Sequence, residues 1–134
     1  MSLTDGRAIA DFLTDTLAKK DIVMRSDGSS VRSFCYIGDF VKGLLTVLLL
    51  GKVGEAYNIT NDRSRMSIKE LAIMIAHFNH MKVVHKKRDS KDSYLISRVK
   101  DNNPNVHKLR TLGWSPNISL KQGFKRTYQS FLQK

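Results

Sequence analysis

The first twenty residues alternate apolar and polar positions at the three-to-four-residue spacing of an amphipathic helix. Residues 7–19 predict a helix whose buried face comprises Ile9, Phe12, Leu13, Thr16 and Leu17. Residues 22–24 then form a short run suited to a β-strand. The pair Asp27-Gly28 is typical of a turn.

Residues 34–37 combine aromatic and β-branched side chains and predict a second strand. A helix is expected to open at Gly38-Asp39 and to run to about Leu50, with Gly51 as its C-terminal stop. This helix is apolar around most of its circumference, so the sequence predicts that it is deeply buried.

The second half of the chain continues the alternation of strands and helices. Residues 56–59 predict a third strand and residues 83–84 a fourth. Ser67 and Glu70 have the spacing of a capping box, which predicts a helix from there to about Phe78. Residues 86–103 are polar and give no clear assignment.

Two further helices are expected near the C-terminus. Asn105 is a candidate N-cap for a short helix that ends at Gly113. Ser119 and Gln122 form a second capping box. The last helix should bury a stripe formed by Leu120, Phe124, Thr127, Tyr128 and Phe131. The pattern as a whole predicts a mixed α/β domain of about five helices and four short strands.

The amino-acid composition indicates the class of protein and the cellular environment that we expect for it. The chain has 134 residues, of which 41% are hydrophobic and 26% charged, as in ordinary globular domains. Its single cysteine, Cys35, excludes an intrachain disulfide and fits a reducing cytoplasm. The longest aliphatic run, residues 44–50, is far shorter than the roughly 20 residues that cross a bilayer, so no membrane association is expected.

A formal net charge of +11 predicts attraction to anions such as nucleic acid or phosphorylated small molecules. The alternative is that a fragment has lost an acidic partner half. Charge alone does not choose between these explanations.

Three stretches carry a resemblance to a known family. Residues 26–39 read SDGSSVRSFCYIGD, residues 54–59 read GEAYNI, and residues 108–116 read KLRTLGWSP. In this order and spacing they resemble the C-terminal region of the extended short-chain dehydrogenases that modify nucleotide sugars, which include epimerases, 4,6-dehydratases and UDP-glucuronate decarboxylases. The resemblance implies that residues 5–134 are the substrate-binding C-terminal portion of a Rossmann-type protein. Residues 1–4 are interpreted as an expression remnant.

Two hallmarks of that family are missing from these 134 residues. The eight glycines are scattered, and no G-x-x-G-x-x-G loop that would approach the NAD pyrophosphate is present. No tyrosine is followed four positions later by the lysine that assists proton transfer. We therefore expect NAD to bind the parent protein only, and this chain to contain no catalytic residue and to be inactive alone.

The resemblance also assigns candidate substrate-binding residues. Arg32 falls on the arginine that grips the substrate diphosphate in the family; the alternative is a surface arginine at a strand edge. Val23 and Met24 fall where the family's chain passes the nucleobase, or they are a plain core strand.

Three further positions match the family less well. Arg98, Lys100 and Asn105 lie where the family often has a second basic clamp and a residue facing the ribose or sugar. An N-cap is the simpler interpretation of Asn105.

Other reactive side chains have structural interpretations. The four histidines have no recognised zinc spacing, so no metal site is expected. Cys35 is interpreted as a core residue, Asp39 as a helix cap and Trp114 as a packing anchor.

The leading hypothesis is binding of a UDP- or dTDP-linked sugar within an NAD-dependent epimerase or dehydratase. The rival is a small basic nucleic-acid-binding module that uses Lys86, Lys87, Arg88 and Lys91, but only Tyr94 is near that run to stack on bases, so no nucleic-acid partner is expected. A third possibility is a degenerate assembly domain. Faces made to pack on the missing half predict a homo-oligomer.

Overall fold

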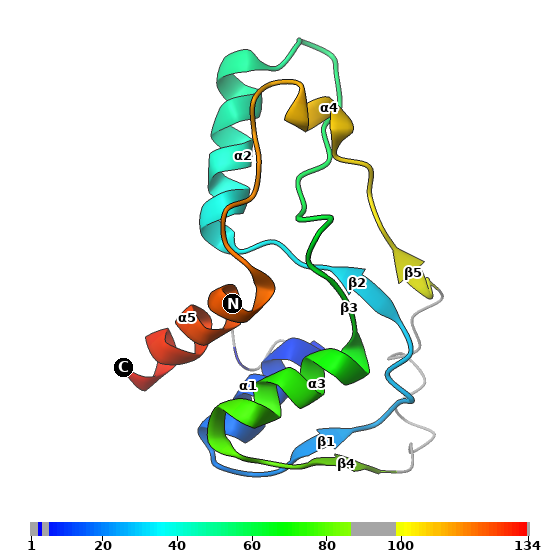
Figure 1. Cartoon of the computed structure of the whole chain (residues 1–134), viewed down its shortest axis with the longest axis vertical. Coiled ribbons are helices and arrows are strands. Elements are labelled where there is room, and N and C mark those ends of the chain that lie inside the picture. The colour runs from blue at the N-terminus through cyan, green and yellow to red at the C-terminus, as the bar shows by residue number, and fades with distance from the viewer. Residues whose placement is uncertain (1–2, 4–5, 87–98, 134) are drawn as a thin grey trace.

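The structure is a computed structural model that describes residue 3, residues 6–86 and residues 99–133. Its helices and strands form two groups that are stacked along the long axis of the molecule (Figure 1). Among the described residues, the helices are α1 (Ala8–Leu17), α2 (Ile37–Leu50), α3 (Ile68–Ala76), α4 (His107–Arg110) and α5 (Leu120–Leu132), with a 3₁₀ turn η1 (His77–Asn79) after α3. The strands are β1 (Ile22–Met24), β2 (Val31–Ser33), β3 (Arg65–Ser67), β4 (Val83–His85) and β5 (Asp101–Asn102).

The strands form two small sheets. β1 and β4 pair in parallel, with Ile22 opposite Val83. The second sheet has the order β3-β2-β5, in which β2 is antiparallel to β3 and parallel to β5. The α/β class predicted from the sequence is therefore confirmed, with five short strands where about four were expected.

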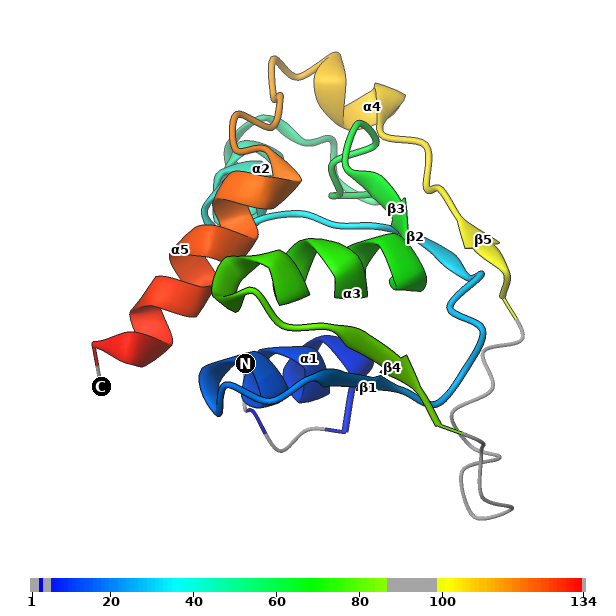
Figure 2. The same ribbon diagram turned by 60° about the horizontal axis from the view of Figure 1, so that its bottom comes forward.

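The main core lies between α1, α3, α5 and the β1–β4 pair, and α1 and α3 pack side by side (Figure 2). Its buried members are all apolar: Phe12, Leu13, Ile22, Met24, Leu71, Ala72, Ile75, Ala76 and Phe124. Phe12, Leu13 and Phe124 come from the faces that the helical spacing predicted for residues 7–19 and for the last helix. The other core residues lie on β1 and α3, and the amphipathic pattern therefore identified part of this core.

Both predicted capping boxes are present. The Ser67 hydroxyl accepts the N–H of Glu70, and the Glu70 carboxylate accepts the N–H of Ser67 at 2.8 Å. Ser119 and Gln122 make the same reciprocal pair at the start of α5. These local contacts satisfy N–H groups that have no partner inside a helix, which fixes where α3 and α5 begin.

Two predicted strands are wrong. Residues 34–36 have no regular structure, and the strand lies earlier, at β2, because Val31 and Arg32 find backbone partners on both β3 and β5. Residues 56–59 also form no strand. Their hydrogen bonds described in the structure pair a side chain with a main-chain group, as where the Asn58 amide donates to the carbonyl oxygen of Asn105 at 2.9 Å.

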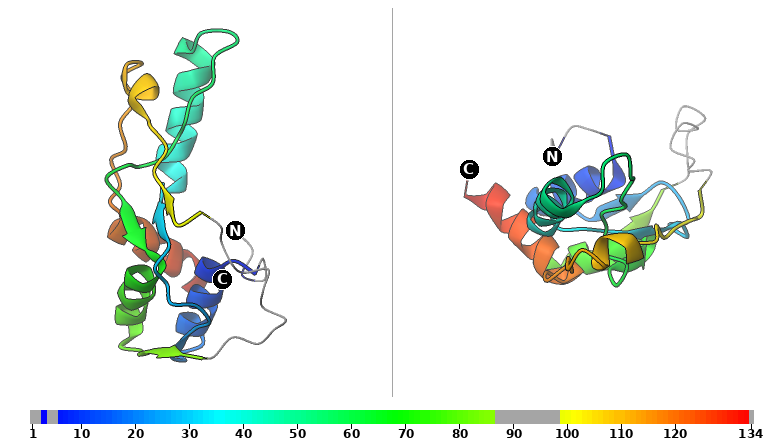
Figure 3. Two further views of the ribbon diagram at one scale, coloured as in Figure 1. Left: turned by 90° about the vertical axis from the view of Figure 1, so that its right-hand side faces the viewer. Right: turned by 90° about the horizontal axis from the view of Figure 1, so that it is seen from above.

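Helix α2 was predicted in the right place but in the wrong environment. It begins at Ile37 and ends at Leu50, yet only Asp39 and Gly43 on it are buried. Leu48 and Leu49 are 76% and 77% exposed. The helix stands along the long axis at one end of the molecule and has neighbours on one side only (Figures 1 and 3). The expectation of deep burial is therefore wrong.

Asp39 does not cap its helix, contrary to the sequence interpretation. Helix α2 has no side-chain cap. The Asp39 carboxylate instead accepts the backbone N–H groups of Asn117 and Ile118, at 3.1 and 2.8 Å. Trp114 is 1% exposed beside it, which confirms the packing-anchor interpretation. Asp39 and Trp114 thus fasten α2 to the segment that follows α4.

The short helix near the C-terminus is shorter than predicted. α4 ends at Arg110, and a turn covers residues 111–113. The Asn105 side chain accepts the N–H of His107 at 2.8 Å, as its capping interpretation requires, although the residue at the formal N-cap position is Val106. In the part of the chain that the structure describes, no helix has the length and apolar character needed to span a membrane.

Candidate functional site

Arg32 occupies the centre of the three-stranded sheet. It lies on β2 opposite Met66 of β3 on one side and opposite Asn102 of β5 on the other. Both neighbouring strands therefore fix its backbone, so its side chain starts from a rigid position. The strand-edge alternative is wrong, because β2 is the central strand.

The guanidinium of Arg32 is held by main-chain carbonyl groups. Its Nη1 donates to the carbonyl oxygen of Val31 and its Nη2 to that of Val99, each at 2.7 Å. The side chain is half-buried. A phosphate oxygen is a stronger acceptor for a guanidinium than a neutral carbonyl, so an arriving diphosphate can compete for these donors.

Lys100 is brought next to Arg32 by the parallel pairing of β2 and β5. The carbonyl oxygen of Lys100 accepts the N–H of Val31 at 2.8 Å, and its side chain is exposed. The pairing of β2 with β5 therefore brings the backbones of two predicted basic residues, 68 positions apart in the sequence, close to each other. Arg98, the third, lies outside the described residues.

Asn105 follows β5 and stands at the start of the α4 segment. Its side chain is engaged by His107 and its carbonyl by Asn58, as described above. These contacts account for the residue structurally. A contact with a sugar stays a prediction.

Val23 and Met24 lie on β1, in the other sheet. Met24 is 2% exposed within the main core, and its carbonyl oxygen accepts the N–H of Lys86 at 3.0 Å. The N–H of Val23 donates to the carboxylate of Asp15 at 3.3 Å. The structure thus supports the core-strand interpretation, and a contact between these residues and a nucleobase stays a prediction.

Arg65 is a basic residue of this sheet that the sequence did not single out. Its Nη2 contacts both carboxylate oxygens of Asp101 at 2.6 Å. Strand alternation places Arg65, which pairs with Ser33, on the opposite face from Arg32. It therefore does not form a second clamp with Arg32. The sequence alone could not have shown that Arg65 belongs to this sheet, because its position depends on how β3 pairs with β2.

The largest hollow among the pockets described is elsewhere. A cavity of about 600 Å³ lies between residues 34–37 and α5, and Cys35, Tyr36, Phe124 and Arg126 are among its lining. Arg32 is not part of that lining. This cavity therefore does not coincide with the predicted diphosphate site, and a ligand contact of Arg32 stays a prediction.

Cys35 lines this cavity as a protonated thiol. Burial, and to a smaller extent the charge of Asp39, raises the pKa of Cys35 to about 11. A thiol is a poor nucleophile unless it is ionised. The absence of a reactive thiolate agrees with a structural residue, but Cys35 is half-buried at a cavity wall and is not the core residue that the sequence predicted.

Metal chemistry has no support in the part of the chain that the structure covers: residues 6–86 and 99–133 hold no cluster of three or more histidine, cysteine, aspartate or glutamate side chains able to bind a metal ion. Of the basic run that motivated the nucleic-acid alternative, only Lys86 is described. It is exposed, and its N–H pairs with β1.

Comparison with known proteins agrees with the motifs. Residues 2–60 match the model of the NAD dependent epimerase/dehydratase family. UDP-glucuronic acid decarboxylase 1 of Arabidopsis thaliana is 29% identical over 133 residues, which cover 98% of this chain and 29% of the plant protein. The dTDP-glucose 4,6-dehydratase of Xanthomonas campestris pv. campestris is 27% identical, over 90% of this chain and 36% of that protein.

Solved structures share the fold. The UDP-glucuronic acid 4-epimerase of Bacillus cereus, in complex with UDP-glucuronic acid and NAD, superposes with a TM-score of 0.79 at 24% identity, over 96% of this chain and 40% of that one. The dTDP-glucose 4,6-dehydratase of Bacillus anthracis, in complex with NAD, gives a TM-score of 0.80 at 21% identity, over 96% and 39%. The chain spans about a third of the length of the curated relatives it matches. The motifs, the family model over residues 2–60 and the shared fold thus make this chain similar to members of the NAD-dependent epimerase/dehydratase family.

Proposed function

We propose that this chain forms the substrate-binding wall of an NAD-dependent epimerase or dehydratase that acts on a UDP- or dTDP-linked sugar, and that Arg32 contacts the sugar nucleotide's diphosphate. The observation that carries the proposal is the position of Arg32 on the central strand β2, with Lys100 beside it on the incoming β5 segment. Two neighbouring cations on a rigid sheet suit a ligand that carries two phosphate groups.

The similar proteins support this class of ligand. The names of the Arabidopsis and Xanthomonas relatives include UDP-glucuronic acid and dTDP-glucose, and the Bacillus cereus structure contains UDP-glucuronic acid. Both ligands consist of a nucleoside diphosphate linked to a hexose-derived sugar. The shared diphosphate is the part that a guanidinium recognises best.

NAD binding is proposed for polypeptide outside these 134 residues. The glycines with positive φ, Gly6, Gly28, Gly54 and Gly113, lie in four separate loops and form no cradle for a pyrophosphate. The sequence has no tyrosine-lysine pair at helical spacing either. The residues present therefore do not fit the cofactor, and no redox or proton-transfer step is assigned to them.

The proposed division of labour also fits the charge and the cysteine content. A net charge of +11 favours an anionic nucleotide at this wall. A single, protonated cysteine is compatible with the cytoplasm that we propose as the protein's location.

Binding of free UDP tests this proposal. The parent chain should bind UDP weakly, and Arg32→Ala should abolish that binding, whereas a substitution at Lys86 should not. Unchanged UDP affinity in Arg32→Ala would contradict the assignment.

A further inference from the structure

An ion pair crosses the three-stranded sheet on the face opposite Arg32. Both carboxylate oxygens of Asp101 on β5 lie 2.6 Å from Nη2 of Arg65 on β3. In the register of the sheet, Arg65 is opposite Ser33, and Asp101 is opposite Val31. Val31 and Ser33 are two residues apart and share one face of β2, so the ion pair lies on that face and Arg32 on the other.

The ion pair joins two strands that are not neighbours. The sheet order is β3-β2-β5, so β2 lies between Arg65 and Asp101. Adjacent strands are about 4.8 Å apart, which separates β3 from β5 by about 10 Å. The long side chain of Arg65 reaches over β2 to close this distance. Arg65 therefore fastens β5 to the rest of the sheet.

β5 is short, so side-chain contacts matter for its position. It consists of Asp101 and Asn102, and two residues supply few ladder hydrogen bonds. The Ser33 hydroxyl donates to the carbonyl oxygen of Asn102 at 3.2 Å. Ser33 and Arg65 thus both hold β5 from the central and far strands of the same sheet.

The segment that is held in this way also orients Arg32. Nη2 of Arg32 donates to the carbonyl oxygen of Val99 at 2.7 Å, two residues before β5 begins. The N–H of Val31, next to Arg32, donates to the carbonyl oxygen of Lys100 at 2.8 Å. A displacement of β5 would therefore move an acceptor that holds the guanidinium. Because a guanidinium binds phosphate groups through a rigid planar set of donors, its orientation affects how well it binds.

We propose that Arg65 is a positioning residue for the diphosphate site: its ion pair with Asp101 fixes β5 on β2, and β5 in turn orients Arg32. The inference rests on the proposed contact between Arg32 and a diphosphate. Arg65 itself lies on the opposite face of the sheet and does not touch that ligand. Its loss should therefore weaken UDP binding without abolishing it.

Asp101→Ala distinguishes positioning from the effect of charge alone. The substitution adds one net positive charge to the chain, which by itself should strengthen the binding of an anion such as UDP. If the ion pair positions Arg32, the same substitution should weaken that binding. Since exposed ion pairs contribute modestly, we expect the UDP dissociation constant to rise about two- to fivefold in Asp101→Ala and in Arg65→Ala. Arg65→Lys keeps a cation for Asp101 and should lie between Arg65→Ala and the parent.

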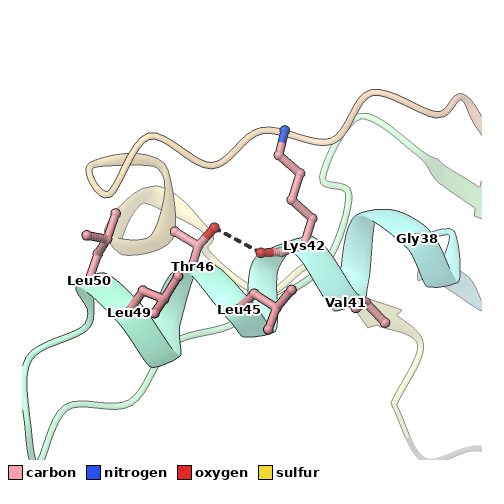
Figure 4. Close-up of a pocket in the computed structure, with 7 residues that line it drawn as sticks. All are labelled: Gly38, Val41, Lys42, Leu45, Thr46, Leu49 and Leu50. Atoms are coloured by element: carbon pink, nitrogen blue, oxygen red, sulfur yellow. Dashed lines mark hydrogen bonds between the residues drawn. The ribbon is translucent and has the colours of Figure 1, made fainter.

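Two variants outside the sheet are matched controls. Glu55→Ala breaks a surface ion pair with Lys108 and changes the net charge as Asp101→Ala does. Lys42→Ala removes one positive charge as Arg65→Ala does. Lys42 lines a groove of about 440 Å³ on α2, and Figure 4 shows its ammonium pointing away from the apolar lining residues. Neither control should reproduce the loss of UDP affinity.

The position of β5 can also be measured without a ligand. The side chains of Arg65 and Asp101 are 37% and 58% exposed, so their substitution should leave the fold intact, which far-UV circular dichroism checks. The Val31 amide, whose N–H pairs with Lys100, should exchange its hydrogen faster in Arg65→Ala and Asp101→Ala than in the parent. The double variant Arg65→Asp/Asp101→Arg restores an ion pair of reversed sign and should recover both the protection of this amide and the UDP affinity that Arg65→Asp alone loses.

A UDP titration of the 134-residue chain and its variants gives the deciding result. Weaker binding by both Arg65→Ala and Asp101→Ala, with unchanged binding by the two controls, is the expected outcome. If the parent binds UDP and Arg32→Ala does not, an Asp101→Ala chain that binds UDP as tightly as the parent, or more tightly, overturns the role of Arg65 and leaves the proposed function intact. A parent chain that does not bind UDP, or an Arg32→Ala chain that binds it unchanged, overturns the proposed function and this inference together.

Discussion

The indole N–H of Trp114 donates a hydrogen bond to the main-chain carbonyl oxygen of Asp39 at 3.0 Å, across 75 residues of sequence. The Asp39 carboxylate completes this link by accepting the N–H groups of Asn117 and Ile118. The first turn of α2 is therefore tied both to the tryptophan and to the loop that leads into α5. These hydrogen bonds attach the otherwise exposed helix α2 to the segment that contains Trp114, Asn117 and Ile118.

Removal of the Asp39 carboxylate should destabilise the chain. Asp39→Ala leaves two partly buried backbone N–H groups without an acceptor, and each such loss costs about 1–3 kcal/mol. We expect the free energy of unfolding to fall by about 2–6 kcal/mol, with a smaller loss for Asp39→Asn, which keeps one oxygen acceptor. Urea unfolding at a fixed protein concentration measures both.

The control for Asp39 is an exposed carboxylate. Glu55 forms an ion pair with Lys108 at the surface, and exposed pairs contribute little. Glu55→Ala should therefore change the free energy of unfolding by less than about 1 kcal/mol. If Asp39→Ala were as mild as Glu55→Ala, the tie between α2 and the C-terminal loop would not be structural.

The capping box of α3 gives a prediction about acid stability. Hydrogen bonds from the Ser67 side chain and backbone lower the pKa of Glu70. Because the folded-state pKa is depressed, this stabilisation is present above the unfolded carboxyl pKa and is lost as the pH falls through the folded value. Ser67→Ala should destabilise the chain by about 1 kcal/mol near neutral pH and by less in acid.

Ser130→Ala serves as the comparison for Ser67→Ala. The Ser130 hydroxyl bonds the Thr127 carbonyl oxygen on the exposed surface of α5 and caps nothing. Its unfolding free energy should follow that of the parent at every pH. A Ser67→Ala effect of the same size at pH 3 and pH 7 would show that Glu70 does not take part.

Cys35 should react slowly with alkylating reagents while the chain is folded. Its pKa is raised from 9.0 to about 11, so the folded chain has about 50-fold less thiolate than the unfolded chain at pH 9. Iodoacetamide labelling at pH 9, with and without urea, measures the ratio.

The raised pKa of Cys35 also contributes stability that is fully present below about pH 9 and is lost as the pH rises through about 11. Equal labelling rates in both states would contradict the burial of this thiol.

The chain alone should not turn over nucleotide sugars in the presence of NAD. The glycine-rich loop and the tyrosine-lysine pair are both missing from its sequence. A coupled assay with UDP- and dTDP-linked sugars, on protein purified free of host enzymes, should give no product above a no-protein blank. Reproducible turnover would show that cofactor binding and proton transfer reside within these residues.

Local signals were the most reliable guide from sequence to fold. The Ser67–Glu70 and Ser119–Gln122 spacings located the starts of α3 and α5, because a capping box is a contact between near neighbours. β1 was also found where its apolar residues indicated, since both of its ends are buried in the main core. Interactions of this kind need no knowledge of distant segments.

Long-range pairing and solvent exposure could not be predicted in the same way. The strand that contains Arg32 is stabilised by pairing with β3 and β5, which are distant in sequence. The local sequence favoured a strand at the aromatic residues 34–37 instead, and that prediction was wrong. The apolar character of α2 is plain in the sequence, but whether its outer side has a partner within the chain is not. For the candidate site, the motif located Arg32, whereas its proximity to Lys100 required the β2–β5 pairing.

If Arg32 recognises a nucleoside diphosphate, a titration of UDP followed by NMR chemical shifts should detect that contact. The parent chain should bind UDP with millimolar affinity, about −4 kcal/mol, and uridine should bind more weakly because it lacks the diphosphate. Arg32→Ala removes a charge-assisted contact worth about 1.5–3 kcal/mol and should make binding undetectable. Arg32→Lys keeps the charge without the planar fork and should bind with intermediate affinity.

Lys86→Ala is the matched control in that titration, since it removes one exposed positive charge away from β2 and should leave UDP binding unchanged. A random oligonucleotide, titrated at two salt concentrations, shows whether any anion binding is merely nonspecific, because such binding falls steeply with salt. UDP binding should be lost in Arg32→Ala and kept in Lys86→Ala. An Arg32→Ala chain that binds UDP as tightly as the parent would contradict this expectation.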